Sequence, residues 1–84
     1  MGEVGAFKFR VGGHRVQLSA AQVVKKLRGF EPGPIQSHAV DVAGITYPVK
    51  EAFAAATGLD VLDFNTNQAR SIFKKLGFKV SRIG

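Results

Sequence analysis

The residues whose types and spacing could do chemistry gather near the C-terminus, in a segment that carries one sign of charge. No acidic residue follows Asp63 in the sequence. Five cations lie beyond it, namely Arg70, Lys74, Lys75, Lys79 and Arg82. The apolar residues of this segment recur at helical spacing, which predicts a helix with one buried face. The opposite face of that helix is then polar and basic, and consists of Asn67, Gln68, Arg70, Ser71, Lys74 and Lys75.

This face has the side chains that a helix needs to contact nucleic acid. Asparagine and glutamine can pair with adenine edges and arginine with guanine, while serine and lysine hold phosphates. The predicted DNA-binding residues of this segment are therefore Asn67, Gln68, Arg70, Ser71, Lys74, Lys75 and Lys79. The alternative is a solvated helix face whose cations lie near the C-terminus, where they suit the helix dipole.

Contacts to the phosphate backbone are better supported than base readout. Asn67 and Gln68 lie in the first turn of the helix, where capping can occupy their side chains instead. About five phosphate contacts would give a slope of about −4.5 for log K against log salt. Stacking of single strands has less support, since most phenylalanines fall on predicted core faces and Tyr47 is the one ambiguous ring.

The overall charge indicates the same class of partner. Twelve lysines and arginines against six aspartates and glutamates give a net charge of +6 over 84 residues. A basic domain suits a polyanion such as DNA, RNA or an anionic membrane, although the same charge can serve solubility alone. The chain has no apolar run near the ~20 residues that span a bilayer, and its first residues lack a signal-peptide core. We therefore expect a cytoplasmic protein, with association with the nucleoid as one option.

Catalytic, cofactor and metal sites have little support in the sequence. No serine sits in a G-x-S-x-G elbow, and no glycine-rich segment matches a phosphate-binding or dinucleotide-binding loop. The chain has no cysteine, and its histidines and aspartates do not occur at metal-ligand spacing. We therefore expect a protein that is not an enzyme, with no cofactor, no metal and no small-molecule substrate.

The first expected element is a hairpin. Residues 7–11 alternate apolar and basic side chains, Gly12-Gly13 suits a two-residue turn, and residues 14–18 return. This register places Arg10 directly opposite Arg15, and like charges so placed repel by up to about 1 kcal/mol. A bound phosphate would relieve the repulsion; alternatively, both guanidinium groups turn into water. The apolar face comprises Phe7, Phe9, Val11, Val16 and Leu18, and the polar face Lys8, Arg10, Arg15 and Gln17.

A helix and a second hairpin follow. Ser19 can cap a helix over residues 20–28, and the hairpin has strands at residues 37–42 and 45–47. His38 lies at the edge of its apolar face, where a histidine is more often packed and hydrogen-bonded than a ligand. The other residues of that face are Val40, Val42, Ile45 and Tyr47.

Two further helices and a closing strand complete the expected elements. Pro48 is pre-set for the first position of the next helix. Asn65 and Gln68 fit a capping box for the last helix, and residues 78–80 alternate as a strand. We expect one α+β domain over residues 1–84, in which two hairpins and a short C-terminal strand form one small antiparallel sheet with about three helices packed on it.

Four short motifs in the second half of the chain together resemble a known family. They are Tyr47-Pro48-Val49-Lys50, Asp63-Phe64-x-Thr66, Ala69-Arg70 and Leu76-Gly77-Phe78. In this order and spacing they are similar to the small N-terminal head-like domain of actinobacterial modification-dependent HNH restriction endonucleases, and to related short actinobacterial proteins. The resemblance covers roughly residues 35–80. It implies an association with DNA, without cleavage because no nuclease motif is present, and it favours Lys50 and Arg70 as residues that touch DNA.

The leading expectation is non-catalytic binding of double-stranded DNA. The last helix would approach a groove of the duplex, assisted by Lys8, Arg10 and Arg15 if the first hairpin lies on the same side. One alternative is a protein-interaction or dimerisation module of a larger assembly, with a homodimer or another protein as the partner. A further alternative is RNA binding. Binding to a membrane surface is least favoured, because the basic helices turn their apolar residues inward.

Overall fold

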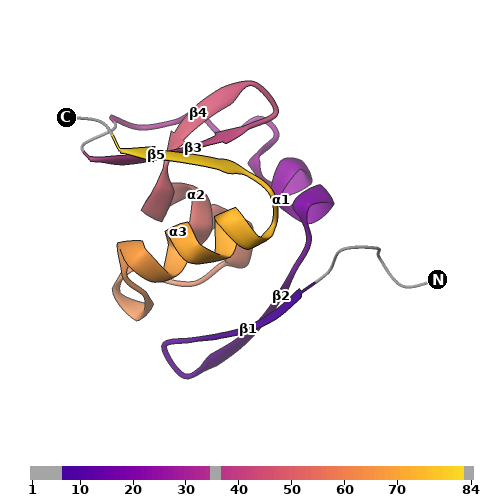
Figure 1. Ribbon diagram of the computed structural model, residues 1–84, viewed down its shortest axis with the longest axis vertical. Helices are drawn as coiled ribbons and strands as arrows, with labels where there is room; N and C mark the ends of the chain where they lie inside the picture. The colour runs from indigo at the N-terminus through magenta and orange to yellow at the C-terminus, as the bar shows by residue number, and fades with distance from the viewer. Residues whose placement is uncertain (1–6, 35–36, 83–84) are drawn as a thin grey trace.

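The computed structural model describes residues 7–34 and 37–82, which form antiparallel strands and three α-helices (Figure 1). In chain order the elements are β1 (Phe7–Val11), β2 (His14–Leu18), α1 (Ala20–Leu27), β3 (His38–Val42), β4 (Ile45–Pro48), α2 (Val49–Thr57), the short 3-10 helix η1 (Val61–Asp63), α3 (Thr66–Lys75) and β5 (Lys79–Arg82). The α+β class and the three helices expected from the sequence are confirmed. None of the helices in the described ranges is long and apolar enough to cross a membrane.

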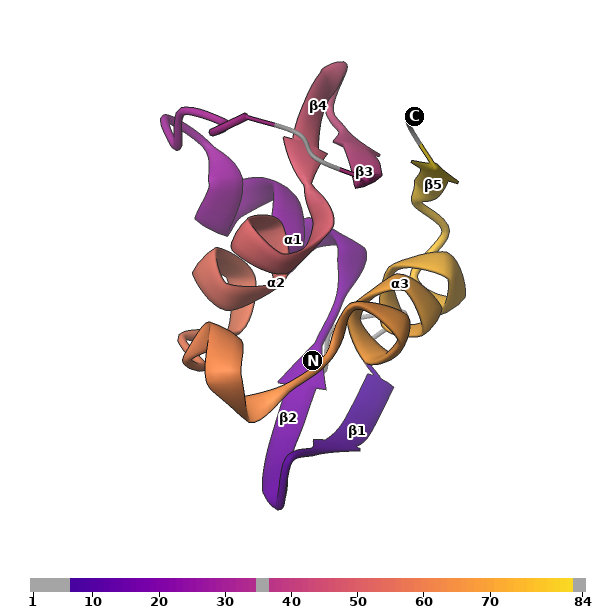
Figure 2. The same ribbon diagram turned by 90° about the vertical axis from the view of Figure 1, so that its left-hand side faces the viewer.

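The strands form two separate sheets, and the expectation of one sheet was wrong. β1 and β2 form a two-stranded sheet, while β3 lies between β4 and β5 in a three-stranded sheet. The C-terminal strand therefore pairs only with the second hairpin. Figures 1 and 2 show the helices between the three-stranded sheet and the β1–β2 hairpin, so each sheet covers a different side of the helical layer.

Both hairpins have the register that their two-residue turns require. Val11 pairs with His14 and Arg10 with Arg15, as expected. Val42 pairs with Ile45 across the second turn. The turn residues all have positive φ, which is the signature of the primed turns that join twisted strands: Gly12 54°, Gly13 82°, Ala43 51° and Gly44 83°.

Local hydrogen bonds fix the beginnings of two helices. Ser19 and Gln22 form a reciprocal capping box on α1, and Asn65 and Gln68 form one on α3. In the second box the Gln68 amide donates to Asn65 Oδ1 at 2.8 Å, and the Asn65 amide donates to Gln68 Oε1 at 3.0 Å. Pro48 precedes α2 as its N-cap and belongs to β4, one position earlier than expected, and it provides no side-chain cap. α1 ends at Leu27, one residue earlier than expected.

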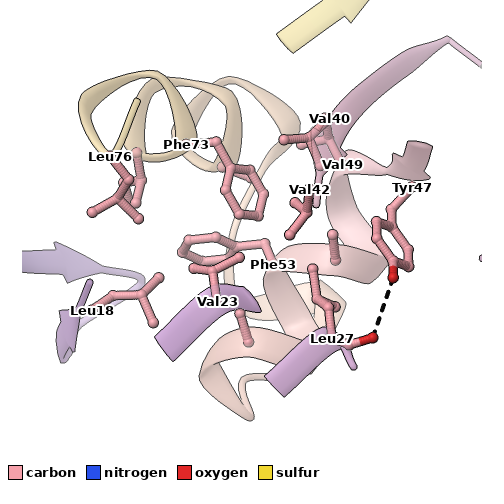
Figure 3. Packing of buried hydrophobic residues seen from close by; sticks show 14 of the residues in the cluster. Leu18, Val23, Leu27, Val40, Val42, Tyr47, Val49, Phe53, Phe73 and Leu76 are labelled. Atoms are coloured by element: carbon pink, nitrogen blue, oxygen red, sulfur yellow. Dashed lines mark hydrogen bonds between the residues drawn. The ribbon is translucent and has the colours of Figure 1, made fainter. Parts of the chain in front are cut away.

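The core lies between the three helices, the three-stranded sheet and the first hairpin, which contributes Val11 and Leu18 (Figure 3). Phe53 is fully buried, and its ring packs edge-on against the rings of Phe64 and Phe73, with centroid distances of 4.7 Å and 5.8 Å. Tyr47 is buried beside them, and its hydroxyl donates to the carbonyl oxygen of Leu27 at 3.2 Å. This bond connects β4 to the end of α1. Edge-on aromatic pairs add about 0.5–1.5 kcal/mol beyond the burial of their area.

The turn of the first hairpin is packed against the segment that precedes α3. A Cβ atom on Gly12 would collide with the carbonyl oxygen of Asp63, so the two backbones touch. Next to this contact, His14 Nε2 lies 3.7 Å from Asp63 Oδ2. The hairpin is therefore held beside the N-terminus of α3, and this places β1 along the helix.

Candidate nucleic-acid interface

Helix α3 presents a polar and basic ridge to solvent. Its buried side consists of Ala69, Ile72 and Phe73, with Leu76 at the C-cap. Successive residues turn by about 100° around a helix, so Asn67 and Lys74 lie on the side opposite this core. Asn67, Ser71, Lys74 and Lys75 are all exposed. We call these four residues the α3 ridge. None of them is acidic.

A groove runs between β1 and α3, on one flank of the ridge. Its apolar floor is formed by Phe9, Val11 and Ile72. Polar and basic side chains line the rest of it: Arg10, Asn65, Asn67, Gln68, Ser71 and Lys75. We call this the hairpin groove. It brings Arg10 of the first hairpin together with four predicted DNA-binding residues of α3, although these segments are more than fifty positions apart in the sequence.

The capping box determines which atoms the hairpin groove offers to a ligand. The side-chain oxygens of Asn65 and Gln68 already accept backbone hydrogen bonds. Each of these oxygens keeps one further lone pair, and each NH2 group adds two donors. Gln68 is half-buried and its oxygen already serves the box, whereas Asn67 is exposed and takes no part in it. Capping was considered for both Asn67 and Gln68, and of these two residues Gln68 takes part in the capping box.

A second groove lies on the other flank of α3, where the N-terminus of α2 meets β3. Lys50, Thr66 and His38 line it together with Pro34, Ser37, Pro48, Val49 and Glu51. We call this the histidine groove. The first turn of α2 has no side-chain cap, and Lys50 Nζ lies 5.7 Å from the centroid of the Phe64 ring. Uncapped amide groups and a nearby lysine favour an anion, while Glu51 in the same turn opposes it.

Arg70 belongs to this second flank and is not on the α3 ridge. It is half-buried, and its Nε atom has no hydrogen-bond partner in the described part of the chain. Its guanidinium lies close enough to His38 to act on that side chain. Burial lowers the pKa of His38, and the positive charges of Arg70 and Arg82 lower it further. His38 Nδ1 is also buried without a hydrogen-bond partner among the described residues, so this nitrogen does not make the expected hydrogen bond.

Three other predicted residues belong to elements other than α3. Arg15 lines a different groove, with Lys26 of α1 and the end of α2. Lys79 is opposite Asp41 in the register of β3 and β5. Lys50 lies in the histidine groove, as described above. Eight of the ten predicted DNA-binding residues therefore lie on the ridge of α3 or on one of its two flanks. Arg15 and Lys79 lie outside this arrangement.

The structure exposes apolar side chains that the sequence pattern placed in the core. Phe7 is 42% exposed and Ile45 46%, although both lie on the apolar faces of their hairpins. Leu62 in η1 is 89% exposed. Tyr47, the ring that was ambiguous in the sequence, is buried. Alternation along a strand identifies a face but not how far the rest of the chain covers it, so no sequence signal distinguished Phe7 from the buried Val11.

No group of three or more histidine, cysteine, aspartate or glutamate side chains comes together as a metal site within residues 7–34 and 37–82. Two acidic side chains near the N-terminus of α3 are engaged locally, while Glu51 lines the histidine groove. Asp63 lies against His14, and Asp60 accepts a hydrogen bond from the backbone of Leu62. The groups that remain available around α3 are mainly donors and cations.

The chain belongs to the SCO5918-like family, which matches residues 10–83. The match includes the first hairpin from Arg10 onward as well as α3, whereas Phe9 of the hairpin groove lies before the matched residues. Comparison with curated proteins and with solved structures returned no match.

Proposed function

We propose that this member of the SCO5918-like family binds double-stranded DNA, mainly through contacts between the phosphate backbone and α3. One observation carries the proposal. The exposed ridge of α3 bears two lysines, an asparagine and a serine, and further cations stand on both of its flanks. Clustered cations of this kind release counterions from DNA when they bind, and this release supplies much of the affinity.

The position of α3 suits contact with a duplex. Figure 2 shows the helix at the edge of the molecule, with the β1–β2 hairpin on one side and β5 on the other. Lys74 lies on the exposed ridge, and Lys75 and Arg10 border the hairpin groove. On the opposite flank, Lys50 lines the histidine groove and Arg70 lies near His38. A helix so placed can lie along a groove of the duplex, with cations directed to the phosphates on either side.

Base readout would have a small part in this interaction. Asn67 is exposed and outside the capping box, so its amide can pair with an adenine edge. Gln68 offers its NH2 group, because its oxygen already accepts a hydrogen bond from the Asn65 backbone. The resemblance of the second half of the chain to endonuclease head domains supports the same class of ligand. A DNA-binding role would also place the protein in the cytoplasm with the nucleoid.

Titration of the folded protein against a labelled random-sequence duplex tests the proposal. Fluorescence anisotropy across a salt series should show binding that weakens steeply with salt, with a slope of about −3 to −5 in log K against log salt. Structured RNA of equal length should compete less well than unlabelled duplex. Absence of binding at low salt by a protein with a folded circular dichroism spectrum would refute the proposal.

A second candidate function, contact with another protein, is favoured by the tip of η1. Leu62 is 89% exposed and Val61 39%, and Asp60 and Asp63 flank them. Carboxylates beside these apolar side chains repel phosphates, so this tip is unsuited to DNA. Exposed apolar side chains flanked by carboxylates suit contact with a basic surface on a partner protein.

Light scattering after size-exclusion chromatography measures the oligomeric state and so tests whether the chain associates with itself through η1. A Leu62→Ser variant should shift an oligomer of the wild-type chain toward monomer if the partner is another copy. The Ile45→Ser variant removes another exposed apolar residue, 46% exposed, from the turn of the second hairpin and serves as the control. A wild-type chain that is monomeric at high concentration would exclude self-association through η1.

A further inference from the structure

We propose that the hairpin groove, with Phe9 in its floor and the exposed ring of Phe7 next to it, binds an unpaired nucleotide of DNA. The inference rests on the proposed DNA function and identifies which part of the DNA this groove takes. A base in a duplex is covered on both faces by its neighbours. Only a base in a single strand, a bulge or an opened pair can offer a face to a protein ring.

The first observation is a pair of aromatic rings at the surface. Phe7 and Phe9 are two positions apart on β1 and lie on the same face of the strand. Their ring centroids are 6.2 Å apart, and the rings are tilted by 39°. Phe9 packs against the core and is half-buried, so it is fixed in place, while Phe7 remains 42% exposed. A fixed ring next to an accessible one makes a stacking surface that accepts any base.

The second observation is the composition of the rim. Arg10, Ser71 and Lys75 line the hairpin groove, and no acidic side chain is among its lining residues. The NH2 groups of Asn65 and Gln68 add donors to the rim, while each of their oxygens already accepts one backbone amide. The groove therefore matches a ligand rich in acceptors.

The two observations together fit the two ends of a nucleotide. Its phosphate oxygens accept hydrogen bonds and carry the negative charge that Arg10 and Lys75 would meet. Its base has an apolar face for the phenylalanine rings, and a pyrimidine such as thymine has carbonyl acceptors at its edge for the amide donors. A free phosphate would satisfy the rim but leave the rings without a partner. An acidic peptide would satisfy the charge without requiring the rings.

A single tryptophan at the rings tests the proposal directly. The chain has no tryptophan, so Phe7→Trp places one fluorophore at the stacking surface. Addition of a ten-residue thymidine oligonucleotide should quench this fluorophore as the base stacks on the indole. Ile45→Trp, at the turn of the second hairpin, is the matched control because the native residue there is equally exposed. Its fluorescence should not change when the oligonucleotide is bound.

The affinity of ring-deletion variants for the thymidine oligonucleotide provides an independent test. Phe7→Leu keeps an apolar side chain but removes the ring, and should weaken binding of the thymidine oligonucleotide by about tenfold. Binding of a fully paired duplex should change by less than about twofold, since its bases are not available for stacking. Ile45→Ala should leave both affinities unchanged. A circular dichroism spectrum like that of the wild type establishes that each variant is folded.

Different failures have different meanings. Bound oligonucleotide that leaves the Phe7→Trp fluorophore unquenched, or quenches both fluorophores equally, overturns the stacking proposal while the duplex function stands. Equal quenching by a poly-glutamate peptide shows a groove for acidic protein and also overturns it. If neither duplex nor single strand binds, the proposed DNA function falls and this inference falls with it.

Discussion

Gly12 is the residue on which the position of the first hairpin depends. It has a φ of 54°, and a side chain there would collide with the carbonyl oxygen of Asp63. Positive φ alone costs a residue other than glycine about 1 kcal/mol. Because the colliding atom belongs to the backbone, it cannot turn away as a side chain would. We expect Gly12→Ala to lower the free energy of unfolding by about 2–4 kcal/mol, as measured by urea denaturation.

Gly13 provides the control for this prediction. It also has positive φ, 82°, but a Cβ there would meet no atom within 4 Å. Gly13→Ala should therefore cost only the backbone strain, about 1 kcal/mol. Equal costs for the two substitutions would show that the hairpin turn does not touch the segment before α3.

His38 should make stability depend on pH. Burial, followed by the charges of Arg70 and Arg82, lowers its pKa in the folded protein, whereas an unfolded histidine titrates near about 6.5. The unfolded chain therefore binds the proton more readily. The contribution of neutral His38 to stability is complete above about pH 6.5 and is lost as the pH falls from there toward the lower pKa of the folded state.

The measurement is the urea midpoint at pH 7.5 and at pH 5.5. The wild-type chain should lose more stability between these values than the His38→Gln variant, which cannot take up the proton. His14 is present in both proteins, so its contribution cancels. An identical loss in the two proteins would contradict a lowered pKa for His38.

At the scale of elements, α1 and β4 are joined by one buried hydrogen bond. The Tyr47 hydroxyl donates to the Leu27 carbonyl oxygen, which also accepts from the Phe30 amide. Tyr47→Phe removes the hydroxyl but leaves the carbonyl one partner. We therefore expect a loss of about 1 kcal/mol. Thermal unfolding should show a correspondingly lower Tm, and a Tm unchanged or raised would mean that this bond does not stabilise the fold.

Elements that depend on short-range patterns could be predicted from the sequence. The two-residue turns determine the pairing of Arg10 with Arg15, and the caps at Ser19 and Asn65 determine where α1 and α3 begin. Gly58 and Gly77 end helices because they adopt positive φ at low cost. In each case the interacting residues are within a few positions of one another, so the sequence alone contains the information.

The arrangement of these elements could not be predicted in the same way. Alternation indicated the apolar faces of both hairpins but not whether the hairpins join one sheet, and the helices in fact separate them. The same limit applies to the site. The helical period placed Arg70 on the exposed face of α3, but β3 approaches that side and half-buries it beside His38. Packing between distant segments decided both outcomes.

At the scale of the whole molecule, the charges on α3 are distributed over a ridge with a groove on each side. Arg10 and Lys75 border the hairpin groove, while Lys50 lines the histidine groove. Asp60 and Asp63 instead flank Leu62 in η1, and the α3 ridge carries no acidic side chain. This separation favours one orientation on a polyanion, with α3 toward the phosphates and the tip of η1 away from them.

The most direct test of this account compares the salt dependence of duplex binding in two variants with equal charge. Lys74→Ala/Lys75→Ala removes two exposed cations from the last turn of α3, and Lys25→Ala/Lys26→Ala removes two from the last turn of α1. If α3 faces the DNA, the first variant should lower the magnitude of the log K against log salt slope by about 2, and the second should leave it near the wild-type value. Equal changes in both variants would show that the charge of the whole molecule, rather than α3, governs binding, and would contradict the account.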